Sequence, residues 1–197
     1  MNIEPVTLDG ERIRLVPLTL AHHPQLCEVG LDERLWRLTT IRVQTPEDML
    51  RYVRTALQTQ AEGTALPFVI VEKSSGRTIG TTRYHSIHAA HRRLEIGFTW
   101  ISVPWQRSGA NTEAKYLMLK QAFEQYRCFR VEFKADRENE PSCRALLRIG
   151  AKQEGVLRNY MVSRHKGIRD LAVFSIIDAE WPEVKARLEA KLNYRGP

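Results

Sequence analysis

A short polar turn near the middle of the chain has the residue types of a loop that holds an anion. It consists of Gln106-Arg107-Ser108-Gly109-Ala110-Asn111 and leads directly into residues 112–114. Apolar residues alternate before it and recur every three or four positions after it, so the turn joins a strand to a helix. First-turn amides of a helix have no partner inside the helix, and the helix dipole favours an anion there. The turn is therefore predicted to bind phosphate, although α/β proteins also use such turns only to reverse the chain.

The strand before this turn carries the first candidate for acid–base chemistry. Its apolar residues of one parity are Leu94, Ile96, Phe98 and Trp100. We expect these four to share the packed face, which leaves Glu95 on the opposite face, toward a cleft. Partial burial raises the pKa of a carboxylate and makes it a better proton acceptor. Glu95 is therefore the predicted catalytic base. The alternative is an ion pair with Arg92 or Arg14.

Several motifs together resemble one known family, the GNAT N-acetyltransferases. These motifs are Glu95-Ile96-Gly97 with Val103-Pro104, Gln106-x-x-Gly109 with residues 110–114, Asn139-x-x-Ser142, Ile149-Gly150-Ala151, residues 154–158 and Glu180-Trp181-Pro182. The resemblance covers nearly the whole chain and is strongest between Leu94 and Arg158. It is most similar to the branch that contains the ribosomal-protein alanine N-acetyltransferases of the RimJ/RimL type.

The resemblance implies that acetyl-CoA is the co-substrate, that no metal is needed and that the acceptor is a primary amine. In the RimJ/RimL-like branch the acceptor is a protein N-terminal α-amine, which attacks the thioester directly in the family mechanism. Two alternatives stay open at this point. The acceptor could be a small amine or an antibiotic, or the chain could be a catalytically degenerate module that binds CoA or RNA.

Residue by residue, the resemblance assigns most of the cofactor site to the turn. The expected cofactor-binding residues are Ile101, Val103, Arg107, Ser108, Gly109, Ala110, Asn111, Thr112 and Asn139. The backbone near Ile101 and Val103 would pair with the pantetheine arm as an added strand does. Asn111 stands where the family prefers glycine or alanine, and it could instead cap the helix. Asn139 would bond the pantetheine arm, or would only cap the helix that begins at Glu140.

The expected proton donor departs from the commonest pattern of the family. Many relatives carry a tyrosine at the position of Leu146, so that mechanism is excluded here. Ser142 resembles the serine that the ribosomal-protein enzymes use as the acid, although a serine in a first helical turn is common without any role. Those enzymes also carry a glutamate after the position of Gly155, and residues 158–161 contain none.

Two further groups of residues have competing interpretations. The resemblance places acceptor recognition near Trp36, which is equally well explained as a core residue. His85, His88 and His91 recur at every third position. On a strand this spacing puts successive side chains on opposite faces, so we expect no metal site there.

The elements that must position these residues follow from periodicity and turn signals. We expect strands at residues 11–19, 66–72, 78–87, 94–103, 131–135, 156–162 and 171–177, and helices at 21–38 with a break near Gly30, 45–63, 112–126, 139–149 and 180–192, with a last hairpin around Lys166-Gly167. Short connections make residues 66–101 an antiparallel meander, whereas the helical crossover lets residues 131–135 run parallel to the strand before it. The prediction is an α+β fold: one GNAT-like domain over residues 1–197, a mixed sheet of about seven strands flanked by helices.

Composition narrows the class of protein. The 197 residues are 43% hydrophobic and 27% charged, which is typical of a globular domain with one core. We expect no membrane span and no secretory signal, and the three cysteines show no CxxC spacing, so a cytoplasmic location is predicted. The net charge of +7 comes from scattered residues, so nucleic acid is not expected as a direct ligand. The oligomeric state stays open, a homodimer included.

Overall fold

The computed structural model describes residue 1 and residues 3–39, 41–163 and 167–193. The helices are α1 (His23–Gly30), α2 (Pro46–Ala61), α3 (Ala110–Lys120), α4 (Glu140–Ile149) and α5 (Trp181–Leu192). The strands are β1 (Leu8–Asp9), β2 (Ile13–Pro17), β3 (Leu66–Glu72), β4 (Thr78–His88), β5 (Arg93–Ile101), β6 (Arg130–Asp136), β7 (Lys152–Ser163) and β8 (Gly167–Ile177). A π-helical turn at Gln121–Gln125 extends α3.

The strands form one mixed sheet in the order β1-β2-β3-β4-β5-β6-β8-β7, and the predicted α+β class is confirmed. The sheet has eight strands within the described residues, one more than predicted, because Leu8 and Asp9 pair with β2. β5 and β6 are parallel, as expected from the crossover, and every other neighbouring pair is antiparallel. Lys166, in the expected last turn, lies outside the described residues.

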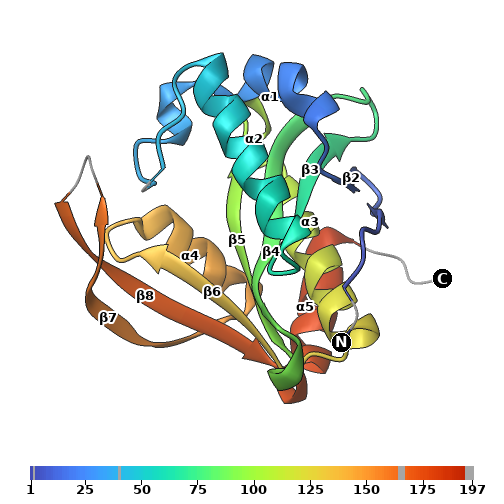
Figure 1. Ribbon diagram of the computed structural model, residues 1–197. Helices are drawn as coiled ribbons and strands as arrows, with labels where there is room; N and C mark the ends of the chain where they lie inside the picture. The colour runs from blue at the N-terminus through green and yellow to red at the C-terminus, as the bar shows by residue number, and fades with distance from the viewer. Residues whose placement is uncertain (2, 40, 164–166, 194–197) are drawn as a thin grey trace.

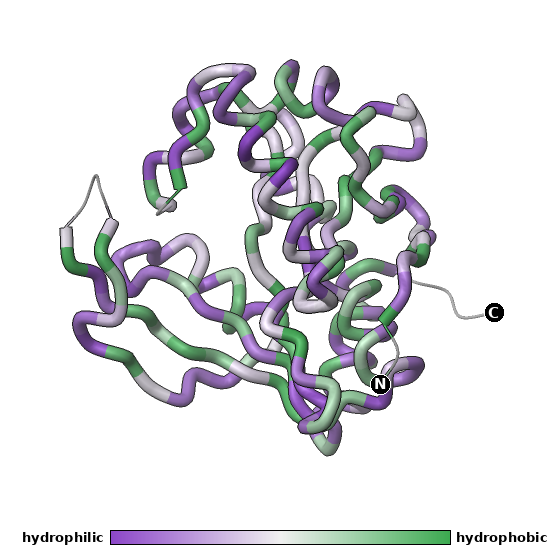
Figure 2. The backbone as a smooth tube through the Cα atoms, in the orientation of Figure 1, coloured by the Kyte–Doolittle hydropathy of each residue, from purple (hydrophilic) through white to green (hydrophobic). Residues whose placement is uncertain are grey.

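The two faces of the sheet bury separate hydrophobic cores. α1 and α2 cover one face, where Leu26, Met49 and Val53 are fully buried in one cluster (Figure 1). α3 and α5 cover the other face, where the cluster includes Leu119 and Leu188. Hydrophobic and hydrophilic positions alternate along the helices in Figure 2, as expected for helices that bury one side.

Local chemistry sets the start of α2 where the sequence predicts it. The Thr45 hydroxyl accepts a hydrogen bond from the Asp48 amide at 3.2 Å, and the Asp48 carboxylate accepts one from the Thr45 amide at 3.3 Å. This reciprocal capping, with Pro46 at the first position, satisfies amides that the helix itself leaves unpaired. α2 is thereby fixed over β3, β4 and β5, where its Tyr52 reaches the candidate site.

A β-bulge in β5 overturns the expected alternation of that strand. Phe98 has a φ of 50°, and the β4–β5 register shifts between Thr81 and Arg83. The extra residue reverses the parity, so Ile96 and Trp100 lie in different cores and Phe98 is 41% exposed. The prediction that Leu94, Ile96, Phe98 and Trp100 share one face is therefore wrong beyond Ile96.

The two halves of the sheet separate beside this bulge. β5 and β6 pair through three positions, from Arg93 with Arg130 to Glu95 with Glu132, and then diverge. Figure 1 shows β4 and β5 turning toward α2 while β6 and β8 run to the other side. The edge of β5 from Gly97 onward is thus left without a β6 partner. No helix among the described residues is long and apolar enough to cross a bilayer.

Candidate active site

The polar turn forms the corner between β5 and α3 that the sequence predicts. Gly109 is the residue before the helix, with a φ of 92°, and Arg107 has a φ of 62°. Left-handed backbone at these two positions shapes the turn, and α3 begins at Ala110, where first-turn amides have no preceding helical turn to pair with. Glu113 lies in the first turn of α3, where its negative charge is favourable to the helix dipole.

Asn111 does not cap this helix, because Gly109 occupies the capping position and Asn111 lies within the first turn. The capping alternative for Asn111 is therefore wrong. Its Oδ1 atom is buried and has no hydrogen-bond partner among the described residues. The first-turn amides of α3 fit an anionic ligand, such as the diphosphate of a nucleotide carrier.

Arg12 adds a positive charge to the corner, and sequence reasoning missed it. Its Nη1 lies 3.4 Å from the Ser108 carbonyl oxygen and 3.3 Å from the place where a Cβ on Gly109 would stand. The Glu113 carboxylate holds the neighbouring backbone, accepting from the amides of Glu11 at 2.6 Å and Arg12 at 3.3 Å. The alternating arginines of residues 11–14 predict a strand, but only the fold shows which of them reaches the turn.

The two residues whose backbone is predicted to pair with a pantetheine arm lie at the end of β5 (Ile101) and just after it (Val103). The Ile101 carbonyl accepts a hydrogen bond from Gln106 Nε2 at 3.0 Å, and the Ser102 amide donates to the Ile79 carbonyl at 2.8 Å. These bonds hold the end of β5 and the start of the turn together. The expected roles of Ile101 and Val103 toward a pantetheine arm stay predictions.

Asn139 caps α4, as the alternative interpretation holds. Its Oδ1 accepts from the Ser142 amide at 3.2 Å, and its Nδ2 donates to the Leu38 carbonyl at 3.3 Å. Asn139 therefore ties α4 to the segment between α1 and α2, and its role toward a cofactor stays a prediction. Ser142 is half-buried in the first turn of α4, and its hydroxyl has no partner within the described part of the chain.

Glu95 is buried, with 4% of its surface exposed, and two basic side chains hold it. Lys134 Nζ lies 2.8 Å from one carboxylate oxygen, and His85 Nε2 lies 3.4 Å from the other. Burial alone raises the pKa of Glu95, but the hydrogen bonds and charges of His85 and Lys134 outweigh it and lower the pKa. The expected ion pair exists with different partners, since Arg14 pairs with Asp9 instead. The expected rise in the Glu95 pKa is wrong.

Trp36 is packed as a core residue, and it also lines a cavity. Its indole donates to the Gly30 carbonyl at 2.8 Å, and it packs against Tyr52 and Trp100 at 5.9 and 5.7 Å between ring centroids. It also lines a cavity of about 420 Å³ together with residues that include Arg37 and Arg42. A role of Trp36 in acceptor binding stays a prediction.

A second residue that sequence reasoning missed is Lys115, which lies behind the turn on α3. It is 5% exposed, and its Nζ donates to Thr99 Oγ1 at 2.7 Å, just after the bulge. Burial lowers the pKa of Lys115 to about 7. Lysine side chains are mostly exposed in proteins, so only the contact with β5 reveals this environment.

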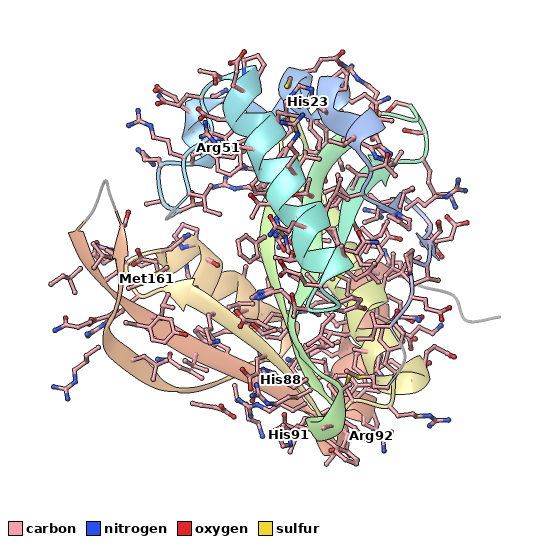
Figure 3. All side chains as sticks on the ribbon, viewed as in Figure 1. His23, Arg51, His88, His91, Arg92 and Met161 are labelled. Carbon is pink, nitrogen blue, oxygen red and sulfur yellow. The ribbon has the colours of Figure 1, made fainter. Side chains whose placement is uncertain are left out.

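The histidines at every third position do not form a cluster. His85 bonds to Glu95, whereas His88 and His91 lie beside Arg92 at the end of the molecule opposite His23 (Figure 3). Among the described residues, no group of three or more His, Cys, Asp or Glu side chains could hold a metal ion.

Comparisons with known proteins agree with this architecture. A family model described as acetyltransferase (GNAT) domain matches residues 12–152. The N-acetyltransferase p20 of Bacillus licheniformis, described as uncharacterized, is 28% identical over 179 residues, covering 89% of this chain and 98% of that protein.

Solved structures share the fold over most of the chain. A GCN5-related N-acetyltransferase from Brucella melitensis superposes with a TM-score of 0.88 at 29% identity, covering 95% of this chain and 86% of that one. Mycobacterium smegmatis RimJ in complex with CoA-disulfide gives a TM-score of 0.80 at 23% identity, covering 95% of each chain, and supports the fold alone. With the turn, the bulge and the diverging strands in place, the chain belongs to the GNAT family of acetyl-CoA-dependent N-acetyltransferases.

Proposed function

We propose that this enzyme acetylates the N-terminal α-amine of a protein or peptide. The observation that carries the proposal is the position of Glu95, a buried carboxylate of lowered pKa at the point where β5 separates from β6. An ionised carboxylate there can accept the proton that an amine loses as it attacks. The motifs similar to ribosomal-protein enzymes, Asn139-x-x-Ser142 above all, favour a peptide amine over a small amine.

In this proposal, different residues bind acetyl-CoA and transfer the protons. Acetyl-CoA supplies an activated thioester, so the protein must hold it, orient the amine and move two protons. The turn from Arg107 to Thr112, with Arg12 beside it, holds the diphosphate through outward amides and positive charge. Glu95 accepts a proton through a water, and the Ser142 hydroxyl donates one toward sulfur.

The proposal is tested by incubating the enzyme with acetyl-CoA and a peptide library that varies the first residues. Acetylated products are read by mass, and thiol release gives the rate. Acetylation at the α-amine of a subset of peptides is the expected result. Thiol release with small amines but with no peptide would move the function to small-molecule acetylation. CoA binding without transfer to any amine would contradict the proposal altogether.

A further inference from the structure

Arg83 is a buried cation on the face of the sheet that α2 covers, next to the bulge. It lies on β4 and is 5% exposed. Its guanidinium carbon stands 4.0 Å from the ring centroid of Phe98 and 5.2 Å from that of Tyr52. The guanidinium therefore rests against two aromatic faces, which attract a cation electrostatically.

Hydrogen bonds and backbone geometry fix both rings. The Tyr52 hydroxyl lies 2.9 Å from Thr81 Oγ1 and 3.3 Å from the Phe98 carbonyl oxygen, so α2 and both strands hold that ring. Phe98 has a left-handed backbone conformation that a bulky residue rarely adopts without external support. The bulge thus presents Phe98 to solvent with Arg83 stacked on it.

Among the described residues, no anion neutralises Arg83, which makes neither an ion pair nor a hydrogen bond there. It keeps 5% of its surface exposed, so part of it still reaches solvent. The nearby acid Glu95 is already shared by Lys134 and His85. A cation this deeply buried is costly unless something pairs with it.

Positive side chains outnumber acids in the cavity next to Arg83. Tyr52, on which Arg83 rests, packs against Trp36, and Trp36 lines the cavity of about 420 Å³. Arg34, Arg37 and Arg42 line that cavity as well, together with one acid, Glu33. A substrate that enters along this surface therefore meets a positive field before it reaches Glu95.

We propose that Arg83 is a specificity residue that binds a carboxylate on the acceptor, close to the amine that is acetylated. The planar guanidinium offers parallel donors to a carboxylate, and stacking leaves its edge oriented for them. Phe98 contacts His85 at 4.9 Å between ring centroids, and His85 bonds to Glu95. The side chains of Phe98 and His85 lie between Arg83 and Glu95, the predicted base. A carboxylate bound by Arg83 would therefore belong to one of the first residues of the acceptor. This inference rests on the proposed function for its peptide form.

The test compares acceptors that differ in one carboxylate. Peptides that start with Ala-Ala, Asp-Ala, Ala-Asp and Ala-Glu are assayed against their Asn and Gln counterparts, with free aspartate and glutamate as a separate arm. The wild-type enzyme is expected to show a kcat/KM about tenfold or more higher for the best acidic peptide than for its amide counterpart. Equal values for every acidic and amide pair would overturn the inference.

Variants test whether Arg83 causes the preference for acidic peptides. Arg83→Gln is expected to reduce the acidic preference to within about twofold, mainly through KM, while values for neutral peptides change little. Arg83→Lys keeps the charge without the planar fork and is expected to retain part of the preference. The matched control Arg54→Gln removes an exposed arginine of α2 and should leave the preference unchanged. A full preference in Arg83→Gln would overturn the assignment.

These experiments distinguish failure of the inference about Arg83 from failure of the proposed function. Melting temperature and CoA affinity show whether each variant is folded, and the wild-type comparison stands even if Arg83→Gln does not fold. Peptides acetylated without regard to acidity would keep the proposed function and refute the role of Arg83. Acetylation of free aspartate or glutamate alone, lost in Arg83→Gln, would refute the peptide acceptor and keep the carboxylate site.

Discussion

Glu95 illustrates how neighbours decide the behaviour of a buried carboxylate. Burial raises its pKa, but His85 and Lys134 together lower it. The group is therefore ionised at neutral pH, ready to accept a proton, at the cost of being a weaker base than a carboxylate with a raised pKa. The same two partners hold the carboxylate oxygens in fixed positions.

Replacing Lys134 by methionine is expected to raise the pKa of Glu95. The variant removes one of the two partners that favour the ionised form, while the burial that opposes ionisation stays. Carboxyl-carbon NMR titration of glutamate-labelled protein measures the value directly. Lys152→Met, which removes a lysine paired with Glu180 instead, is the control. If Glu95 titrates at the same pH in wild type and Lys134→Met, the assigned cause of its lowered pKa is wrong.

Replacing Ser142 by alanine is expected to lower kcat by roughly 10²-fold, the usual contribution of a positioned proton donor. The fold should be unaffected, because Asn139 caps α4 through the Ser142 amide rather than the hydroxyl. Steady-state rates with unchanged CoA affinity check this, and Ser142→Thr, which keeps a hydroxyl, should retain more activity. Wild-type turnover in Ser142→Ala would remove Ser142 from the mechanism.

At the scale of elements, the conformation of the turn before α3 depends on one residue, Gly109. Gly109→Ala is expected to weaken CoA binding by about tenfold, because an L residue at a φ of 92° costs roughly 1–2 kcal/mol and its Cβ would crowd Arg12. Calorimetric titration with CoA measures the affinity. Gly63→Ala carries a similar strain, at a φ of 71°, just after the end of α2 with open space around it. Equal losses of affinity in both variants would mean that the turn has no special role.

Elements were predictable where local chemistry decides them. The strand at residues 66–72 and the start of α2 after Thr45 agree with the structure, since alternation and capping depend on neighbours in the sequence. The bulge at Phe98 was not predicted: Gly97 precedes it, but the apolar alternation continues through Phe98 and Trp100, and the left-handed residue is Phe98 rather than the glycine. β1 escaped prediction for a similar reason, since two residues carry no periodicity.

The candidate site was predictable in its turn between β5 and α3, but not in the cations around it. The turn has a glycine and a helix start that any reader of the sequence can find. Arg83, Lys115 and Arg12 gain their environments from strands and helices distant in the sequence, and nothing in their local spacing distinguishes them from surface arginines and lysines. The surroundings of these cations are therefore visible only once the sheet is assembled.

At the scale of the whole molecule, Lys115 links pH to stability. Burial lowers its folded-state pKa to about 7 from 10.5, so between these values the unfolded chain binds more protons. The free energy of unfolding should therefore rise with pH across this window, by an amount on the order of a few kcal/mol. Urea unfolding of wild type and Lys115→Met at pH 7, 8.5 and 10 measures this.

In Lys115→Met this rise should be missing, whereas Lys120→Met, which removes an exposed lysine of the same helix, should keep it. Parallel pH dependences of wild type and Lys115→Met would show that Lys115 is charged in the folded protein over the whole range.

The central claim is that outward amides at the start of α3 bind the diphosphate of acetyl-CoA. Thermal unfolding with and without CoA or acetyl-CoA tests it most directly. A ligand at about 100 times its Kd stabilises the folded state by about 2.7 kcal/mol, which raises the Tm of a protein of this size by about 5–10 °C. The account predicts such a rise in wild type and a smaller one in Gly109→Ala at the same ligand concentration. An unchanged Tm with both ligands would contradict it.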